Sequence, residues 1–281
     1  MDIAVDNSVI SRMAEDSDLS ASLRSKVAQG GARLVVSLPV LHEALADSNH
    51  RNAMTRARVV VALSVQLGSR FVLTGEVPYI ARCEQARPWS STPPLPAVQR
   101  DRVLAALQNS DLENKLPGLV VDLRQWLGKS KMHEADLKAR AAGAFRLAGH
   151  EPRDLDQLLG NLSDNEAFWD STIVETAADH GRYGQRFREV PRRYRAAVTF
   201  AAYGWLNAVG SMFATFSYGK YAGILRAPRP GDWVDAQIAA CAAYSKVFLT
   251  EDGGQRKRAQ YVWHQFGFKI AAMSAGEWLG G

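Results

Sequence analysis

Four short runs of apolar, β-prone residues along this chain predict a sheet. The runs are Ile3–Val5, Leu34–Val36, Arg70–Thr74 and Val247–Thr250. Between the first three runs, apolar residues recur at helical spacing. The helices expected there cover Ser8–Met13, Ser17–Ala28 (with Ser17 or Asp18 as its N-cap) and Pro39–Leu67, the last as one helix or two. Alternating strands and helices are typical of α/β proteins, so we predict a mainly parallel sheet with right-handed crossovers.

The pattern changes at Arg87, where a segment rich in proline and serine begins. Beyond it, no strand is expected before Val247. Helices are expected instead over Val98–Gln108, Glu113–Trp126, Glu134–Leu147, Leu155–Leu159 and Glu166–Asp179. We therefore interpret residues 1–86 and 230–281 as two parts of one α/β domain. Residues 87–229 are then a helical insertion, or a second domain threaded into the first.

One stretch, Ala196–Gly219, contains no charged residue and is long enough to span a bilayer. It is rich in small residues and poor in leucine and isoleucine, which favours a buried central helix over a transmembrane one. No signal peptide is evident, since Asp2 and Asp6 stand where a basic segment would be. We expect a cytoplasmic protein with no membrane association.

Composition adds little to this picture. A formal charge of +5 leans only weakly toward polyanionic partners, and 47% hydrophobic with 22% charged residues is typical of a globular protein. Cys83 and Cys241 lack the spacing of zinc ligands, so we expect free thiols.

Four carboxylates stand at corresponding places in the predicted sheet. Asp6 follows the first strand, Glu43 lies about one turn inside the helix after the second, Asp235 opens a helix over Ala236–Tyr244, and Asp252 follows the last predicted strand. In an open parallel sheet these places share one edge, where such folds bind ligands. We therefore expect the four side chains to converge.

At these residues the chain resembles the PIN-domain family, the metal-dependent nuclease fold of VapC-type toxins and related ribonucleases. The matching segments are Asp6–Ile10, Leu38–Leu45, Asp235–Ala240, Phe248–Asp252 and Gly267–Leu279. The last of these is similar to the final strand and short closing helix of the family. The resemblance covers residues 1–80 and 230–281 and implies a three-layer α/β/α fold with a central, mainly parallel sheet.

Clustered carboxylates repel one another unless a cation neutralises them, and hard divalent ions are the natural partners. We expect Mg²⁺ or Mn²⁺ rather than Zn²⁺. Asp6 and Asp235 are expected as direct ligands, and Glu43 and Asp252 as ligands through water or to a second ion. Asp232 either caps a helix or joins the cluster. The resemblance also implies that Ser8 and Thr250 line the site with hydroxyls.

A basic segment supplies a candidate nucleic-acid surface. Its arginines are Arg182, Arg186, Arg188, Arg192, Arg193 and Arg195, interleaved with Tyr183, Phe187 and Tyr194. Arginines pair with phosphates and aromatic rings stack on bases, so we expect a groove leading from this segment to Asp6 and Asp235. The alternative is a solvated helix face whose rings dock on the core.

These features favour a metal-dependent endoribonuclease, either a toxin or an RNA-processing enzyme. A PIN-like scaffold that binds nucleic acid or protein without cleaving, and a structure-specific nuclease acting on DNA, are the alternatives. RNA is the expected partner, DNA the second choice. An antitoxin or other protein partner and a homo-oligomer stay open.

Overall fold

A computed structural model describes residues 1–109, 111–115, 118, 125, 155–183, 186–213, 219–229 and 231–281 of the chain. Five parallel strands form one sheet in the order β3-β2-β1-β4-β5. They are β1 (Asp2–Val5), β2 (Arg33–Ser37), β3 (Phe71–Thr74), β4 (Val247–Leu249) and β5 (Ala271–Met273). The mixed α/β class and the parallel sheet are therefore confirmed.

The sheet joins the two ends of the sequence. β1 lies at its centre, with Ala4 paired to Val35 of β2 on one side and to Phe248 of β4 on the other. Every residue of β1, β3 and β4 is buried, as expected for strands covered on both faces. The short apolar runs of the sequence were detectable for this reason.

The helices of the first 86 residues include the predicted ones in their predicted order, together with a last helix that was not predicted. They are α1 (Asn7–Glu15), α2 (Ser17–Gln29), α3 (Leu38–Leu45), α4 (His50–Leu67) and α5 (Val77–Ala86), with a 3₁₀ turn η1 (Gly68–Arg70) before β3. The cap of α2 differs from the prediction. Asp16, not Ser17 or Asp18, is the N-cap, because its Oδ1 accepts from the backbone N–H groups of Asp18 and Leu19.

The described part of residues 87–229 contains helices and 3₁₀ turns. These are α6 (Ala97–Gln108), α8 (Leu155–Leu159), α9 (Glu166–Trp169), α10 (Thr172–Gly181), α11 (Arg186–Glu189), η2 (Pro191–Arg193), α12 (Arg195–Met212) and η3 (Gly219–Tyr221). The single helix expected over Glu166–Asp179 is two helices, because Ser171 caps α10 through a hydrogen bond from Val174 N. The helices expected over Glu113–Trp126 and Glu134–Leu147 lie largely or wholly outside the described residues.

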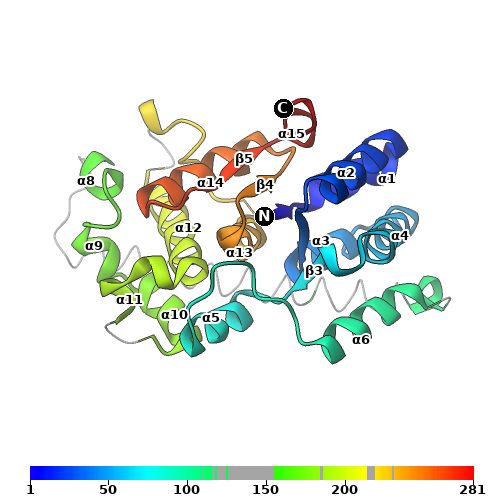
Figure 1. Ribbon diagram of the computed structural model, residues 1–281. Coiled ribbons are helices and arrows are strands. Elements are labelled where there is room, and N and C mark those ends of the chain that lie inside the picture. Colours follow the sequence, from blue (N-terminus) through cyan, green and yellow to red (C-terminus); the bar gives the residue numbers. More distant parts are fainter. Residues whose placement is uncertain are drawn as a thin grey trace.

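The C-terminal part adds α13 (Asp232–Cys241), η4 (Ala242–Tyr244), α14 (Gly253–Gln265) and α15 (Ala275–Gly280). Helix α15 begins with a capping box in which Ser274 and Glu277 satisfy each other's backbone N–H groups. Figure 1 shows α1, α2 and α4 on one side of the sheet and α5, α12, α13 and α14 on the other, an arrangement consistent with three layers.

Helix α12 is the central helix of its layer. Residues from Ala196 to Gly210 are almost all buried, and α12 contacts α5, α10, α13 and α14. This burial confirms a buried helix for the part of the uncharged stretch from Ala196 to Met212. Among the described residues, no helix is long and apolar enough to cross a membrane.

A buried carboxyl group anchors the first turn of α12. Glu84 of α5 has no exposed surface, and its Oε1 accepts from Ala196 N at 2.6 Å and from Tyr244 Oη at 2.7 Å. Its Oε2 accepts from Tyr183 Oη at 2.8 Å. Burial raises the pKa of Glu84 to about 7, although these hydrogen bonds oppose the shift. The carboxyl group thus ties α5, α12 and η4 together.

One continuous hydrophobic core holds the described residues. It contains strand residues such as Ile3 and Phe248 together with Tyr203 and Trp205 of α12. The sheet and the helices after Arg87 therefore share buried surface. The division of the chain into 1–86, 87–229 and 230–281 stays a prediction. Cys83 and Cys241 are free thiols, as expected.

Candidate acidic site

Polar side chains gather where the parallel strands end, which we call the carboxyl edge of the sheet. Asp6 directly follows β1, and Thr250 directly follows β4. Helix α3 starts from the end of β2. Helix α13 precedes β4 and runs back along the sheet, so its first turn, with Asp235, lies at this edge too. The topology therefore brings together positions that are far apart in the sequence.

Asp6 is the most strongly held of these acids. It is 5% exposed and forms the N-cap of α1, with its Oδ1 accepting from Asn7 N at 2.6 Å. Its Oδ2 accepts from Ser8 Oγ at 2.7 Å and from Thr250 Oγ1 at 2.9 Å. Burial raises the pKa of Asp6, and the hydrogen bonds partly oppose that rise. The two hydroxyls expected near the site thus contact a single carboxylate oxygen.

Glu43 and Asp235 lie within electrostatic reach of Asp6 and of each other. Burial, then the charges of Asp6 and Asp235, raise the pKa of Glu43 to about 8. Burial, then the charges of Asp6 and Asp232, raise the pKa of Asp235 to about 7. Burial is the largest cause of both shifts, and the charges of the neighbouring acids add to it at short range. The three acids therefore lie near one another at the carboxyl edge, and we call them the acidic cluster.

Asp252 has a structural role as well as a place near the cluster. Its side chain caps α14, with Oδ1 accepting from Gly254 N at 2.7 Å and Gln255 N at 2.9 Å. It is exposed, and its charge contributes to the raised pKa values of Glu43 and Asp235. One carboxylate oxygen is thus committed to the helix, while the residue still adds negative charge to the cluster.

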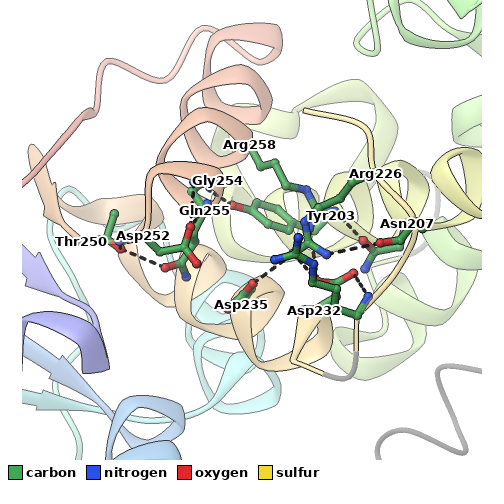
Figure 2. A network of polar contacts seen from close by, with 12 residues as sticks. Tyr203, Asn207, Arg226, Asp232, Asp235, Thr250, Asp252, Gly254, Gln255 and Arg258 are labelled. Carbon is green, nitrogen blue, oxygen red and sulfur yellow. Dashed lines mark hydrogen bonds and ion pairs between the residues drawn. The ribbon is translucent and has the colours of Figure 1, made fainter. Parts of the chain in front are cut away.

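Asp232 lies beside the cluster in a network with two arginines (Figure 2). It is 1% exposed, and its Oδ1 is 2.5 Å from Arg226 Nη2 and 3.7 Å from Arg258 Nη1. Its Oδ2 accepts from Arg229 N at 2.8 Å. Oδ2 is therefore hydrogen-bonded and Oδ1 is paired with two guanidinium groups, so the alternative in which Asp232 joins a metal cluster is not favoured.

Arg258 is the buried centre of this network. It is 1% exposed, donates through Nη2 to Asn207 Oδ1, and lies 5.1 Å from the centre of the Tyr203 ring. Its charge lowers the pKa of Asp235, against the larger effects that raise it. The positive charge behind the acids was not expected from the sequence, because Asn207, Arg226 and Arg258 belong to three separate elements without a recognisable motif.

The donors at this edge are carboxylate and hydroxyl oxygens, which suit Mg²⁺ or Mn²⁺ better than Zn²⁺. Among the described residues, no three His, Cys, Asp or Glu side chains form a group that could hold one ion by themselves. Mg²⁺ usually keeps several waters and binds through one or two carboxylates. Asp6 and Asp235 fit that smaller requirement. Burial raises the pKa of Glu43 and Asp235 first of all, and the charges of neighbouring acids raise both values further.

The basic segment lies elsewhere. Arg195 stacks over the rings of Tyr244 and Phe268, which come shortly before β4 and β5, with distances of 5.4 and 4.7 Å to the ring centres. Arg193 donates to Gln85 O near the end of α5, which has run back from the end of β3. Both arginines therefore lie at the amino edge of the sheet, opposite the acids. These two arginines therefore do not border Asp6, and a groove from the rest of the segment to the acids stays a prediction.

Aromatic rings of this segment are also not available to bases. Tyr183, Phe187 and Tyr194 are at most 5% exposed and belong to the hydrophobic core, so the interpretation of them as a stacking surface is wrong. Arg182, Arg186, Arg188 and Arg192 are exposed, and Arg188 has distant ion pairs with Glu166 and Asp170. A contact of these arginines with nucleic acid stays a prediction.

Comparison with known proteins adds no relative. No family model matches the chain, and no curated protein or solved structure matches it either. Function must therefore be argued from the residues at the carboxyl edge.

Proposed function

We propose that this chain is a divalent-metal-dependent nuclease that hydrolyses phosphodiester bonds at the carboxyl edge of its sheet. One observation carries the proposal. Asp6, Glu43 and Asp235 come from the end of β1, from α3 and from α13, and the fold gathers them into one cluster of partly buried carboxyl groups. Such a cluster is costly for the fold unless a cation or a proton neutralises it.

Each residue of the cluster has a defined part in this proposal. Asp6 and Asp235 would hold the ion, and Glu43 would bind a water of its coordination shell. A bound divalent ion lowers the pKa of a water molecule and offsets negative charge on the phosphodiester. Ser8 and Thr250 orient Asp6 through its Oδ2, and Asp252 adds negative charge from the start of α14.

The proposal that RNA is the substrate rests on the resemblance of the segments around these acids to the PIN-domain family. The resemblance also supports an endonucleolytic reaction and a role as a toxin or an RNA-processing enzyme. A DNA-directed nuclease would use the same acids, so the experiment must offer both polymers.

The test is cleavage of end-labelled single-stranded RNA and of DNA of the same sequence by the purified chain. We expect RNA cleavage with Mn²⁺ or Mg²⁺ and none with EDTA. Asp6→Asn should abolish cleavage. It should also remove the increase in melting temperature that Mn²⁺ gives the unchanged protein, because a ligand stabilises only the state that binds it.

Asp16→Asn is the matched control. Asp6 and Asp16 are both helix N-caps, and asparagine caps a helix about as well as aspartate. Both variants therefore lose one negative charge from a helix N-cap, but Asp16 is exposed and only Asp6 belongs to the cluster. Equal activity of Asp6→Asn and Asp16→Asn would refute the proposal. Nucleic-acid binding without cleavage at any metal concentration would favour a non-cleaving scaffold instead.

A further inference from the structure

An arginine borders the acidic cluster from a segment that the proposed function has not used. The 219–229 segment follows α12 and carries Arg226, whose Nη2 is 2.5 Å from Asp232 Oδ1 and 3.7 Å from Asp235 Oδ2. Arg226 thus contacts both a buried anchor and one of the clustered acids. Figure 2 shows it beside Asp232, on the same side of the network as Asn207.

The 219–229 segment is held firmly in place. Leu225, the residue before Arg226, is 1% exposed, and Tyr221 donates through its hydroxyl to Asp156 Oδ1 at 2.7 Å. Helix α12 has a glycine where the segment crosses it. A Cβ on Gly210 would be 2.3 Å from Arg226 O, so only glycine allows this approach. The backbone of Arg226 is therefore fixed on both sides.

The guanidinium of Arg226 keeps donors to spare. Its contact with Asp232 Oδ1 is an ion pair that lacks hydrogen-bond alignment, and its hydrogen bond to Ala227 O is long, at 3.5 Å. The side chain is 22% exposed, whereas that of Arg258 behind it is 2% exposed. A guanidinium has five N–H donors in a planar fork that matches phosphate. Arg226 can therefore reach a ligand that Arg258 cannot.

The charges around Asp232 also favour contact between Arg226 and an anionic ligand. Two guanidinium groups face the buried carboxylate of Asp232, and one of them, Arg226, also faces Asp235, so positive charge lies at the border of the acids. A polyanion approaching Asp6, Glu43 and Asp235 is repelled by them, and a cation at their border reduces that repulsion.

We propose that Arg226 binds a backbone phosphate of the nucleic-acid substrate, with Asp232 anchoring its guanidinium. This inference rests on the proposed nuclease function. It assigns phosphate binding to the carboxyl edge, in place of Arg193 and Arg195 at the amino edge.

The test measures binding of a fluorescein-labelled single-stranded RNA to protein carrying Asp6→Asn, which cannot cleave it. Arg226→Met in this background should weaken binding about tenfold, as expected for the loss of one charge-assisted contact. The slope of log K against log salt should become shallower by about 0.7, the value for one phosphate of a single strand. With Asp6 restored, the variant should raise KM more than it lowers kcat, since the contact is already present in the bound substrate.

Arg229→Met is the matched control, because Arg229 is exposed on the same segment and carries the same charge. We expect it to leave the salt slope within about 0.2 of the unchanged protein. An equal loss with Arg229→Met would show a diffuse charge effect and overturn the inference. So would an unchanged affinity and slope with Arg226→Met.

Arg226→Lys serves if the methionine variant does not fold, because lysine preserves the charge opposite Asp232. It should keep the slope but bind a few times more weakly, since lysine lacks the planar fork. Unchanged affinity of the lysine variant would refute the inference in that case. If the Asp6→Asn protein binds no nucleic acid and the unchanged protein cleaves none, the proposed function fails as well. A failure confined to the Arg226 variants leaves the proposed function standing.

Discussion

Two carboxyl groups with raised pKa values, one buried and one half-buried, lie at opposite edges of the same sheet. Glu84, near the amino edge, is surrounded by donors from Ala196, Tyr183 and Tyr244. Glu43, at the carboxyl edge, has Asp6 and Asp235 as neighbours, and their charges add to the effect of burial. Burial is the largest cause of both shifts.

The two carboxyl groups differ in the side chains around them and not in the direction of their pKa shifts. A buried carboxyl whose oxygens are satisfied by hydrogen bonds holds the fold together. A carboxyl group placed among other carboxyl groups does not stabilise the fold in this way. Groups of this kind, with shifted pKa values, are concentrated at binding and catalytic sites. On their raised pKa values alone, Glu84 and Glu43 would be equal candidates for a functional residue. Only the side chains around them distinguish the two.

The largest expected difference is in cleavage. Glu43→Gln should lower the cleavage rate by about 10³-fold, because an amide cannot act on the proton of a bound water. Glu84→Gln should lower it by no more than about threefold, since Glu84 lies near the amino edge, away from the acidic cluster, and its shape is preserved. Single-turnover cleavage of labelled RNA by both variants measures the contrast. A similar loss of cleavage rate in Glu43→Gln and Glu84→Gln would show that the two carboxyl groups do not differ in function.

Stability should show the reverse order. Glu84→Ala leaves Ala196 N and the hydroxyls of Tyr183 and Tyr244 without their acceptor and opens a cavity, which should cost about 3–5 kcal/mol. Glu43→Ala relieves repulsion with Asp6 and should change stability by about 1 kcal/mol or less. Urea unfolding followed by tryptophan fluorescence gives both values. A larger loss for Glu43→Ala would contradict the comparison.

The pH dependence of stability has the same sign for both groups. The pKa is raised from 4.5 to about 7 for Glu84 and to about 8 for Glu43, so the folded state binds more protons than the unfolded chain between these values. The stabilising effect of protonation is therefore full below about pH 4.5 and is lost as the pH rises through about 7 to 8. For Glu84 the loss is on the order of 3 kcal/mol.

Magnesium should distinguish the contribution of Glu43 to the pH dependence of stability from that of Glu84. Mg²⁺ should restore stability at pH 8 in the unchanged protein and in Glu84→Gln, but much less in Asp6→Asn, since only the acidic cluster would bind the ion. Melting temperatures between about pH 5 and pH 8.5, with and without Mg²⁺, measure this effect. A stability that rises with pH in this range would show that other groups dominate.

The smallest expected effect concerns Asp252. Asp252→Ser keeps a helix N-cap but removes the charge, so stability should change by less than about 0.5 kcal/mol. Cleavage should fall by about tenfold, which is the usual range for a residue that supports metal ligands indirectly. Asp252→Ala, which also removes the cap, should cost about 1 kcal/mol in addition. Full activity of the serine variant would limit Asp252 to capping α14.

Local patterns predicted the sheet well, for a physical reason. Strands buried on both faces are continuous apolar runs, and Asp6 directly follows the first of them. Parallel topology then determines where the residues after each strand lie. Asp6, Glu43 and Asp235 could be grouped from the sequence because each position is defined by its place relative to a strand.

Residues whose position is not defined relative to a strand could not be located in the fold from the sequence. Arg193 and Arg195 lie far from any strand in the sequence, and only the packing of α12 shows that they belong to the amino edge. Arg226 follows a 3₁₀ turn in a segment without periodicity, so no pattern connects it with Asp232. Glu84 is a single polar residue inside α5, and its partners come from three distant segments.

The pairing of β1 with β4 sets the order in which the site is completed during synthesis. Val5 pairs with Leu249, so the strand that carries Asp6 waits for a partner made near the other end of the chain. At roughly 5–20 residues per second, the ribosome adds Asp252 on the order of ten seconds or more after Asp6. Until then Thr250 cannot donate to Asp6, and Asp235 has no strand β4 to hold its helix against the sheet. An unfinished chain therefore carries the first acids of the cluster without the rest. Under the proposed function, it could not cut the messenger from which it is being translated.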